Sequence, residues 1–221
     1  MSQNKSFARR IGKSLSKLQL GLLKDELPRY LLDPEKLPHK DKYIAEIGIG
    51  MGDHFVERAR LDQSALHIGF EPYLNGVANS LKIIQENEIA NILLWPDDVD
   101  LVISALPDNI LDELYILFPD PWPKTPHHKR RILNKARIKQ FASKIKTDGI
   151  LYFVSDILHY FDAAEEVISG SNLFKDIKTS DEPYEGYIKT KYHHKADLEG
   201  RSARFLVAKR KASESNQTPS S

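Results

Sequence analysis

The sequence predicts an α/β protein with a doubly wound, mostly parallel sheet of seven strands and helices on both faces. Three observations predict it. Short apolar stretches alternate with amphipathic ones through most of the 221 residues. Acidic residues recur where the apolar stretches end, and a glycine-rich turn follows the first of them. The hydrophobic share of 41% and the charged share of 29% are typical of a globular domain.

The predicted strands are short and rich in β-branched or aromatic residues, as buried strands are. They cover 43–47, 65–70, 91–95, 114–118, 150–155, 173–177 and 204–208. Helices are predicted from about 53 and over 73–87, 99–106, 129–146 and 158–169, and the polar stretch 182–200 is predicted as a loop with a short helix. Residues 1–40 are predicted as a basic N-terminal arm, 41–210 as the folded domain and 211–221 as a disordered tail.

The first strand, Tyr43–Ile47, opens into the turn Gly48–Gly52, and a helix follows. Glycine lets a backbone approach a ligand closely, so this unit is typical of nucleotide binding, although a purely structural turn is an alternative. The G-x-G-x-G spacing differs from the dinucleotide pattern G-x-G-x-x-G. Glu46, just before the turn, would oppose a pyrophosphate and suit a cationic ligand.

Four further acidic residues follow strands. Glu71 lies about twenty residues past the glycines, where an acid accepts hydrogen bonds from ribose hydroxyls. Asp98, Asp120 and Asp156 follow the third, fourth and fifth strands. One such acid alone is more often a solvated surface residue. Because parallel strands end at the same edge of a sheet, the set with Glu46 predicts a binding site at that edge.

Residues 114–131, LYILFPDPWPKTPHHKRR, combine a strand with a rigid corner and a cluster of cations. Three prolines in five residues restrict the backbone, so Asp120 and Trp122 are expected on a stiff loop beyond the strand. A carboxylate, an indole and cations on one loop suggest a site for an electron-rich aromatic group on a polyanion. Trp122 either holds a base that has left its stack or packs beneath the loop.

Charge is segregated along the chain although the net charge is +1. Residues 1–24, 124–146 and 189–211 together hold 23 of the 32 Lys and Arg residues but two of the 31 acidic ones. This pattern indicates polyanion binding if the three stretches share a face, and solvated helix faces are the alternative. Residues 1–24 also have the composition of a transit peptide, but an ordered or RNA-contacting arm is favoured.

Several classes of function are disfavoured. The chain has no cysteine, so disulfides, thiolate nucleophiles and cysteine-ligated metals are excluded. The histidines at 127, 128, 193 and 194 lack the spacing of a zinc site, and no metal is expected. No apolar run approaches the ~18 residues that span a bilayer, so no membrane partner is expected.

Five motifs resemble those of the bacterial tRNA (guanine-N7)-methyltransferases. They are AEIGIGMG, FEP at 70–72, FPDPWPK followed by HKRR, VSD at 154–156 and TKY at 190–192, and the similarity runs from about Ser6 to Arg210. The resemblance implies a Rossmann-like class I enzyme that uses S-adenosyl-L-methionine to methylate N7 of a guanosine in the variable loop of tRNA, usually position 46. It also implies a cytoplasmic protein, expected as a monomer or homodimer.

The resemblance implies roles for individual residues. Contacts to S-adenosylmethionine are expected at Glu46, Gly48, Gly50, Glu71, Asp98 and Asp120, and Asp120 is also the expected catalytic residue. Substrate contacts are expected at Lys124, Asp156, Thr190, Lys191, Tyr192 and His193, and RNA contacts at Pro126, His127, His128, Lys129, Arg130 and Arg131. His193 stands where the family's T-x-x-E has glutamate. A neutral histidine has one acceptor nitrogen, whereas a carboxylate accepts from both N1–H and the amino group of guanine.

Three other interpretations remain. A non-catalytic tRNA-binding protein with a relict methyltransferase fold is best supported by His193. An NAD-dependent dehydrogenase is disfavoured by the glycine spacing. A small-molecule methyltransferase is disfavoured by the clustered cations.

Overall fold

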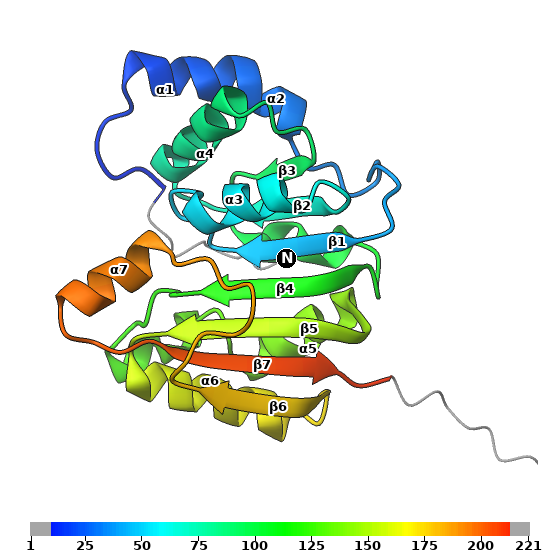
Figure 1. Ribbon diagram of the computed structural model, residues 1–221, viewed down its shortest axis with the longest axis vertical. Helices are drawn as coiled ribbons and strands as arrows, with labels where there is room; N and C mark the ends of the chain where they lie inside the picture. The colour runs from blue at the N-terminus through cyan, green and yellow to red at the C-terminus, as the bar shows by residue number, and fades with distance from the viewer. Residues whose placement is uncertain (1–9, 213–221) are drawn as a thin grey trace, which may run out of the picture.

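The computed structural model describes residues 10–212, so the expectations for residues 1–9 and for the tail from 213 onward lie outside the described residues. Seven strands form one sheet in the order β3-β2-β1-β4-β5-β7-β6 (Figure 1). The prediction of a mostly parallel, seven-stranded sheet is confirmed: β7 is antiparallel to both of its neighbours, and the other paired strands are parallel. The strands are β1 Tyr43–Ile47, β2 Leu66–Phe70, β3 Ile92–Trp95, β4 Leu111–Leu117, β5 Ile145–Ser155, β6 Phe174–Ser180 and β7 Arg204–Arg210.

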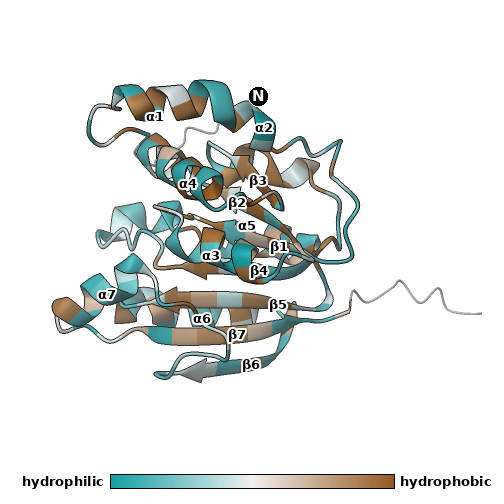
Figure 2. Ribbon diagram, turned by 45° about the horizontal axis from the view of Figure 1, so that its top comes forward, coloured by the Kyte–Doolittle hydropathy of each residue, from teal (hydrophilic) through white to brown (hydrophobic). Residues whose placement is uncertain are grey.

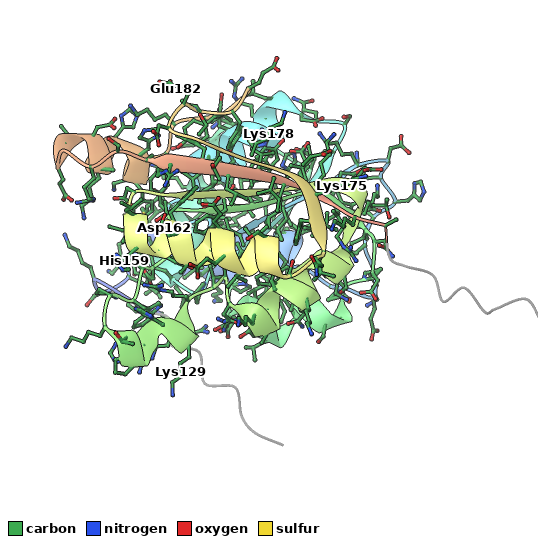
Figure 3. The ribbon with its side chains drawn as sticks, turned by 90° about the horizontal axis from the view of Figure 1, so that it is seen from below. Lys129, His159, Asp162, Lys175, Lys178 and Glu182 are labelled. Carbon is green, nitrogen blue, oxygen red and sulfur yellow. The ribbon has the colours of Figure 1, made fainter. Side chains whose placement is uncertain are left out.

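Helices cover both faces of the sheet. The helices α3 (Asp53–Leu61) and α4 (Leu74–Glu86) lie on one face, and α5 (Lys135–Lys144) and α6 (Leu158–Gly170) lie on the other (Figures 1 and 3). The short helix α7 (Lys191–Leu198) lies beside the edge where the parallel strands end (Figure 1). This arrangement leaves that edge open between the loops that follow β1, β2, β3 and β4.

The core follows from the apolar content of the strands, which is concentrated along the sheet (Figure 2). Side chains that alternate along β1 enter different clusters: Ala45 packs on the α5 and α6 side, and Ile44 packs on the opposite side. On that opposite side, Phe55 of α3 and Leu81 of α4 belong to a third cluster with β3. The central strands are therefore buried on both faces, as in other parallel sheets.

The described part of the expected N-terminal arm packs on the domain. The segments α1 (Lys17–Gly21), a π-helical turn (Leu22–Glu26) and α2 (Leu27–Tyr30) follow each other directly (Figure 1). The first two lie against α4, and α2 lies against β3. Ser16 begins α1 through a capping box with Gln19. Leu22 is buried in the cluster formed by α3 and α4, so this segment is ordered by apolar packing.

Several predicted boundaries are wrong. The helix predicted over 129–146 is instead a 3₁₀ segment, η4 (Thr125–Arg130), a bend, and then α5, while Lys146 belongs to β5. The side chain of Asn134 caps α5 and so fixes its start. The helix predicted over 99–106 consists of two 3₁₀ turns, η2 (Val99–Leu101) and η3 (Ile103–Ala105). Phe118, predicted as the end of a strand, has a φ of 48° and begins the corner instead.

Candidate functional site

A cleft of about 440 Å³ opens at the carboxyl ends of β1, β2 and β4. Its volume lies within the range of small-molecule sites, roughly 300–1,000 Å³. Three of the five predicted strand-end acids line this cleft. The glycine turn, the Pro-rich corner and α7 also contribute to its walls. The lining residues with polar or aromatic side chains are Phe70, Glu71, Tyr73, Asp97, Asp98, Phe118, Asp120, Trp122, Arg130, Arg137 and Tyr192.

The glycine turn forms one wall of this cleft. Gly48, Gly50 and Gly52 have φ values of 81°, 57° and 87°, which favour glycine. A Cβ at Gly48 would meet nothing within 4 Å, so the backbone there faces open space. At Gly50, a Cβ would lie 3.1 Å from the ring of Tyr192, so α7 closes over this part of the turn.

Glu71 ties the glycine turn to the loop after β2. Its Oε2 accepts from the backbone N–H of Gly50 at 2.6 Å, and its Oε1 accepts from that of Tyr73 at 2.9 Å. The side chain lies deep in the cleft, because Glu71 is 7% exposed. Burial raises the pKa of Glu71 to about 7, against the two backbone hydrogen bonds, and the charges of Asp120 and Glu46 raise it further.

The loop after β3 brings two acids to the cleft. Asp98 caps η2, since its Oδ1 accepts from the N–H of Asp100 at 3.1 Å. The indole N–H of Trp95 donates to the Asp98 carbonyl at 3.1 Å. Asp97, which the sequence analysis did not single out, also lines the cleft and pairs with Arg10 at 2.5 Å. The backbone around Asp98 is therefore held from both sides.

The Pro-rich corner places Asp120 and Trp122 in the same cleft. The corner turns sharply because Phe118 and Trp122 both have positive φ, at 48° and 43°. Burial raises the pKa of Asp120 above its ordinary value. Trp122 is not packed in the core: it lines the cleft, the guanidinium of Arg130 lies 4.9 Å from its ring centre, and His127 meets it edge-on.

Glu46 lies outside the cleft lining, in contrast to the sequence-based expectation. Its Oε2 is 2.5 Å from Nδ1 of His54, and the Glu46 and His54 side chains are 5% and 1% exposed. Since Glu46 follows Ala45 on β1, it points to the face that carries Ile44 and Tyr115. The pair joins the strand before the glycine turn to the helix after it, so it supports the turn from below.

The predicted substrate contacts divide into two groups. Tyr192 lines the cleft, and Lys124 and Lys191 are exposed beside it on neighbouring segments. The others are engaged within the fold. Asp156 accepts from Nε of Arg201 at 2.7 Å, and Thr190 caps α7 by accepting from the N–H of His193 at 3.0 Å.

His193, which stands where the family pattern has glutamate, packs among aromatic side chains. Its Nδ1 lies 2.9 Å from the hydroxyl of Tyr187, and its ring packs 5.7 Å from Phe118 and 5.9 Å from Phe205. Desolvation lowers the pKa of His193, against the attraction of Asp197. The residue therefore contacts the first residue of the corner rather than the cleft itself.

The segment predicted to contact RNA is exposed except at its end. Pro126 and Lys129 are exposed, and His127, His128 and Arg130 are partly so. Arg131 is 4% exposed, donates from Nε to the carbonyl of Pro121 at 2.9 Å and lies over the ring of Tyr160. The guanidinium of Arg131 is therefore used inside the fold, and the expected RNA contact at this residue stays a prediction.

The charge segregation seen in the sequence is also partly cancelled by folding. Three cations of the 124–146 stretch pair with acids that lie elsewhere in the chain: Arg137 with Asp100, Lys144 with Asp108 and Lys146 with Asp112. The cations that stay exposed around the corner are fewer than the sequence count indicates.

Residues 10–212 contain neither a cluster of metal-binding side chains nor a membrane-spanning helix. No group of three or more His, Asp or Glu side chains in that range is arranged to hold a metal ion. No helix within it is long and apolar enough to cross a membrane.

Comparisons with known proteins agree with this geometry. A family profile described as "Putative methyltransferase" matches residues 40–206. A bifunctional methyltransferase of Rickettsia felis is 49% identical over 92% of this chain, although the chain spans only 39% of that protein's length. A tRNA (guanine-N(7)-)-methyltransferase of Rhizobium johnstonii is 34% identical over 91% of this chain and 92% of its own.

Solved structures support the fold. An antibiotic-related methyltransferase superposes with a TM-score of 0.58 at 20% identity, covering 81% of this chain and 99% of its own. An S-adenosylmethionine-dependent O-methyltransferase of Thermotoga maritima gives 0.57 at 12% identity, covering 91% and 74%.

The sheet order, the glycine turn and the acids around the cleft define a class I S-adenosylmethionine-dependent methyltransferase. Within that class, the chain belongs to the tRNA (guanine-N7)-methyltransferase family. The cleft fits the cofactor: the backbone at Gly48 faces open space, and the carboxylates of the buried Glu71 and the half-buried Asp98 are available to hydroxyl and amino groups.

Proposed function

We propose that this chain transfers a methyl group from S-adenosyl-L-methionine to N7 of a guanosine in tRNA, at position 46 of the variable loop, in the cytoplasm. The observation that carries the proposal is the shared cleft: Asp120 and Trp122 of the corner line the same cavity as Glu71 and Asp98. The Rhizobium johnstonii relative, which matches over nearly its whole length, supports the choice of substrate.

The proposed roles follow from the walls of the cleft. Gly48 and Gly50 leave room for the cofactor, Glu71 accepts from its ribose hydroxyls, and Asp98 accepts from its adenine amino group. Trp122 and Tyr192 offer aromatic faces to a base that has left its stack. We propose that Glu46 acts through His54 on the shape of the glycine turn.

Methyl transfer requires the protein to align the two reactants and to stabilise the charge that develops on the base. S-adenosylmethionine supplies an electrophilic methyl group on a sulfonium. Guanine N7 carries an in-plane lone pair, so no general base is needed, and the C–S bond electrons stay with sulfur. The product base carries a positive charge. Asp120, which is partly desolvated, offsets that charge as it develops.

The test is mass mapping of methylguanosine in unmodified tRNA treated with this protein and cofactor. We expect 7-methylguanosine at position 46 and none in a tRNA with adenosine there. Binding of tRNA without any methyl transfer would instead establish the non-catalytic RNA-binding alternative, and methylation at another nucleotide would contradict the proposed position.

The raised pKa of Glu71 predicts a pH-dependent affinity for the cofactor product, S-adenosylhomocysteine. The ligand-free fold favours the protonated carboxyl, and hydrogen bonds from ribose hydroxyls favour the ionised one. Affinity should therefore rise about 10-fold between about pH 6 and about pH 8, by proton linkage. Calorimetric titration across this range checks it, and a flat profile for the wild type would contradict the assignment.

The raised pKa of Glu71 also predicts that the ligand-free protein becomes less stable as the pH rises. A carboxyl whose pKa is raised on folding stabilises the ligand-free protein at low pH, and this contribution is lost as pH rises through about 7. Glu71→Gln, which cannot ionise, should remove this slope in thermal unfolding of the ligand-free protein. Persistence of the slope in the variant would assign it to another group.

Exposed cations of the corner are expected to bind tRNA phosphates. Lys124 and Lys129 are exposed on the segment beside Trp122. Replacing both with alanine should reduce the slope of log K against log salt by about 1.5, because two phosphate contacts are lost. Filter binding across salt concentrations measures the slope.

The matched control for this pair is the double alanine variant of Lys175 and Lys178. These two exposed lysines lie at the β6 edge, on the other side of α6 from Lys129 (Figure 3). An equal loss of slope in both double variants would show that the effect is one of net charge and not of contact.

A further inference from the structure

Arg137 contacts two segments that lie apart in the sequence, the turn after β3 and the end of η4. It lies near the start of α5 and lines the cleft, although the sequence pattern indicates no role for it beyond the basic side of a helix. Its Nε lies 2.9 Å and 3.0 Å from the two carboxylate oxygens of Asp100, and its Nη2 also contacts that carboxylate. Through Asp100, Arg137 is linked to the turn that Asp98 caps.

The other side of the same guanidinium holds the η4 segment. Nη1 of Arg137 donates to the carbonyl of Arg131 at 3.0 Å and lies 3.5 Å from that of Arg130. Arg130 is the residue whose side chain stacks on Trp122. These carbonyls end the segment Thr125–Arg130, so its C-terminal end is fixed relative to the Asp98–Asp100 turn.

The geometry requires arginine. Five N–H donors in a planar fork reach a carboxylate on one side and carbonyls on the other at the same time, which the compact ammonium of lysine does not do. The pair is partly withdrawn from water, since the side chains of Arg137 and Asp100 are 17% and 18% exposed. Movement of either segment therefore strains or breaks contacts to the other.

We propose that Arg137 is a positioning residue that couples occupancy of the cofactor site to the conformation of the η4 segment. A ligand that fixes Asp98 also fixes Asp100, and Arg137 then holds Arg130 and Arg131 in one arrangement. The coupling follows because the ligand interacts differently with the two states of this linkage. The contact between Asp98 and the cofactor and the RNA-binding role of η4 both rest on the proposed function, whereas the Arg137 contacts that link the two segments do not.

Hydrogen–deuterium exchange with and without saturating S-adenosylhomocysteine tests the coupling. None of the residues Thr125–Lys129 lines the cleft, so their amides report a transmitted effect. In the wild type we expect the product to slow their exchange about 5-fold or more, the lower end of usual couplings. Arg137→Gln should abolish this slowing while the product still protects the glycine turn.

Two further variants separate coupling from loss of structure. Asp100→Asn removes the charge but keeps the carbonyl contacts of Arg137, so it should weaken the coupling and serves if Arg137→Gln does not fold. Lys139→Gln, at an exposed position on α5, should leave the coupling unchanged. Unaltered slowing in both Arg137→Gln and Asp100→Asn, or no slowing of Thr125–Lys129 in the wild type, would overturn the proposal.

Affinity for tRNA, measured with and without the product, keeps the two proposals apart. A wild-type protein that shows the exchange coupling but binds no tRNA would refute the proposed substrate and leave the role of Arg137 standing. If the product changes the tRNA affinity of the wild type but leaves the tRNA affinity of Arg137→Gln unchanged, the result supports the coupling.

Discussion

Asp120→Asn is expected to lower the rate constant of methyl transfer by about 10²–10³-fold, the usual cost of removing one preorganised electrostatic contact to a transition state. The amide keeps the shape of the side chain but not its charge, and the positive charge that forms on guanine then lacks a partner. Single-turnover transfer to unmodified tRNA measures the rate.

The affinity for S-adenosylhomocysteine should change little in this variant, because the other cleft acids, Glu71 and Asp98, are intact. Comparable losses in rate and in product affinity would show that Asp120 is mainly a cofactor contact. Asp181→Asn is the matched control: its carboxylate is exposed and pairs with Arg204 on the surface.

Gly76→Ala is expected to abolish binding of S-adenosylhomocysteine and to destabilise the fold by about 1–3 kcal/mol, the range for overpacking a tight core. Gly76 lies in the first turn of α4, directly beneath the glycine turn. A Cβ there would lie 2.0 Å from the carbonyl oxygen of Gly50, so α4 and the turn must separate. Calorimetry and thermal unfolding measure the two effects.

Gly170→Ala is the control for this substitution. Gly170 is the last residue of α6, and a Cβ there would meet nothing within 4 Å. Alanine should stabilise that helix end by up to about 1 kcal/mol, because it loses less backbone entropy on folding. Normal product affinity in Gly76→Ala would show that the turn adjusts without cost.

The glycine turn and Gly76 differ in whether their roles can be predicted from the sequence. The turn at Gly48–Gly52 is readable because its glycines follow a strand and precede a helix, a local pattern. Gly76 falls within a regular amphipathic pattern, and nothing local distinguishes it from Ala78, which packs in the same helix. Its role comes from a contact with a residue that lies 26 positions earlier in the chain.

The segment that follows the Pro-rich corner is a second place where the sequence-based prediction is wrong. The helical periodicity continues through Asn134, so the sequence predicts one helix from 129 to 146. Capping by Asn134 ended that pattern locally, since its side chain accepts from the N–H groups of Ala136 and Arg137. Arg131 then turned inward, although its neighbours in the sequence are the exposed cations of the same run.

The alternation of strands and helices, the edge of the sheet that carries the acids and the family to which the chain belongs can all be predicted from the sequence alone. Those features depend on local periodicity and on the order of short motifs, which the chain carries whatever its packing. Which of the acids share the cleft depends on the folded arrangement and could not be predicted from the sequence. Glu71, Asp98 and Asp120 do, whereas Glu46 pairs with His54 and Asp156 with Arg201. The direction of a side chain at the end of a strand depends on the charges and space its neighbours offer, and those neighbours come from distant parts of the chain.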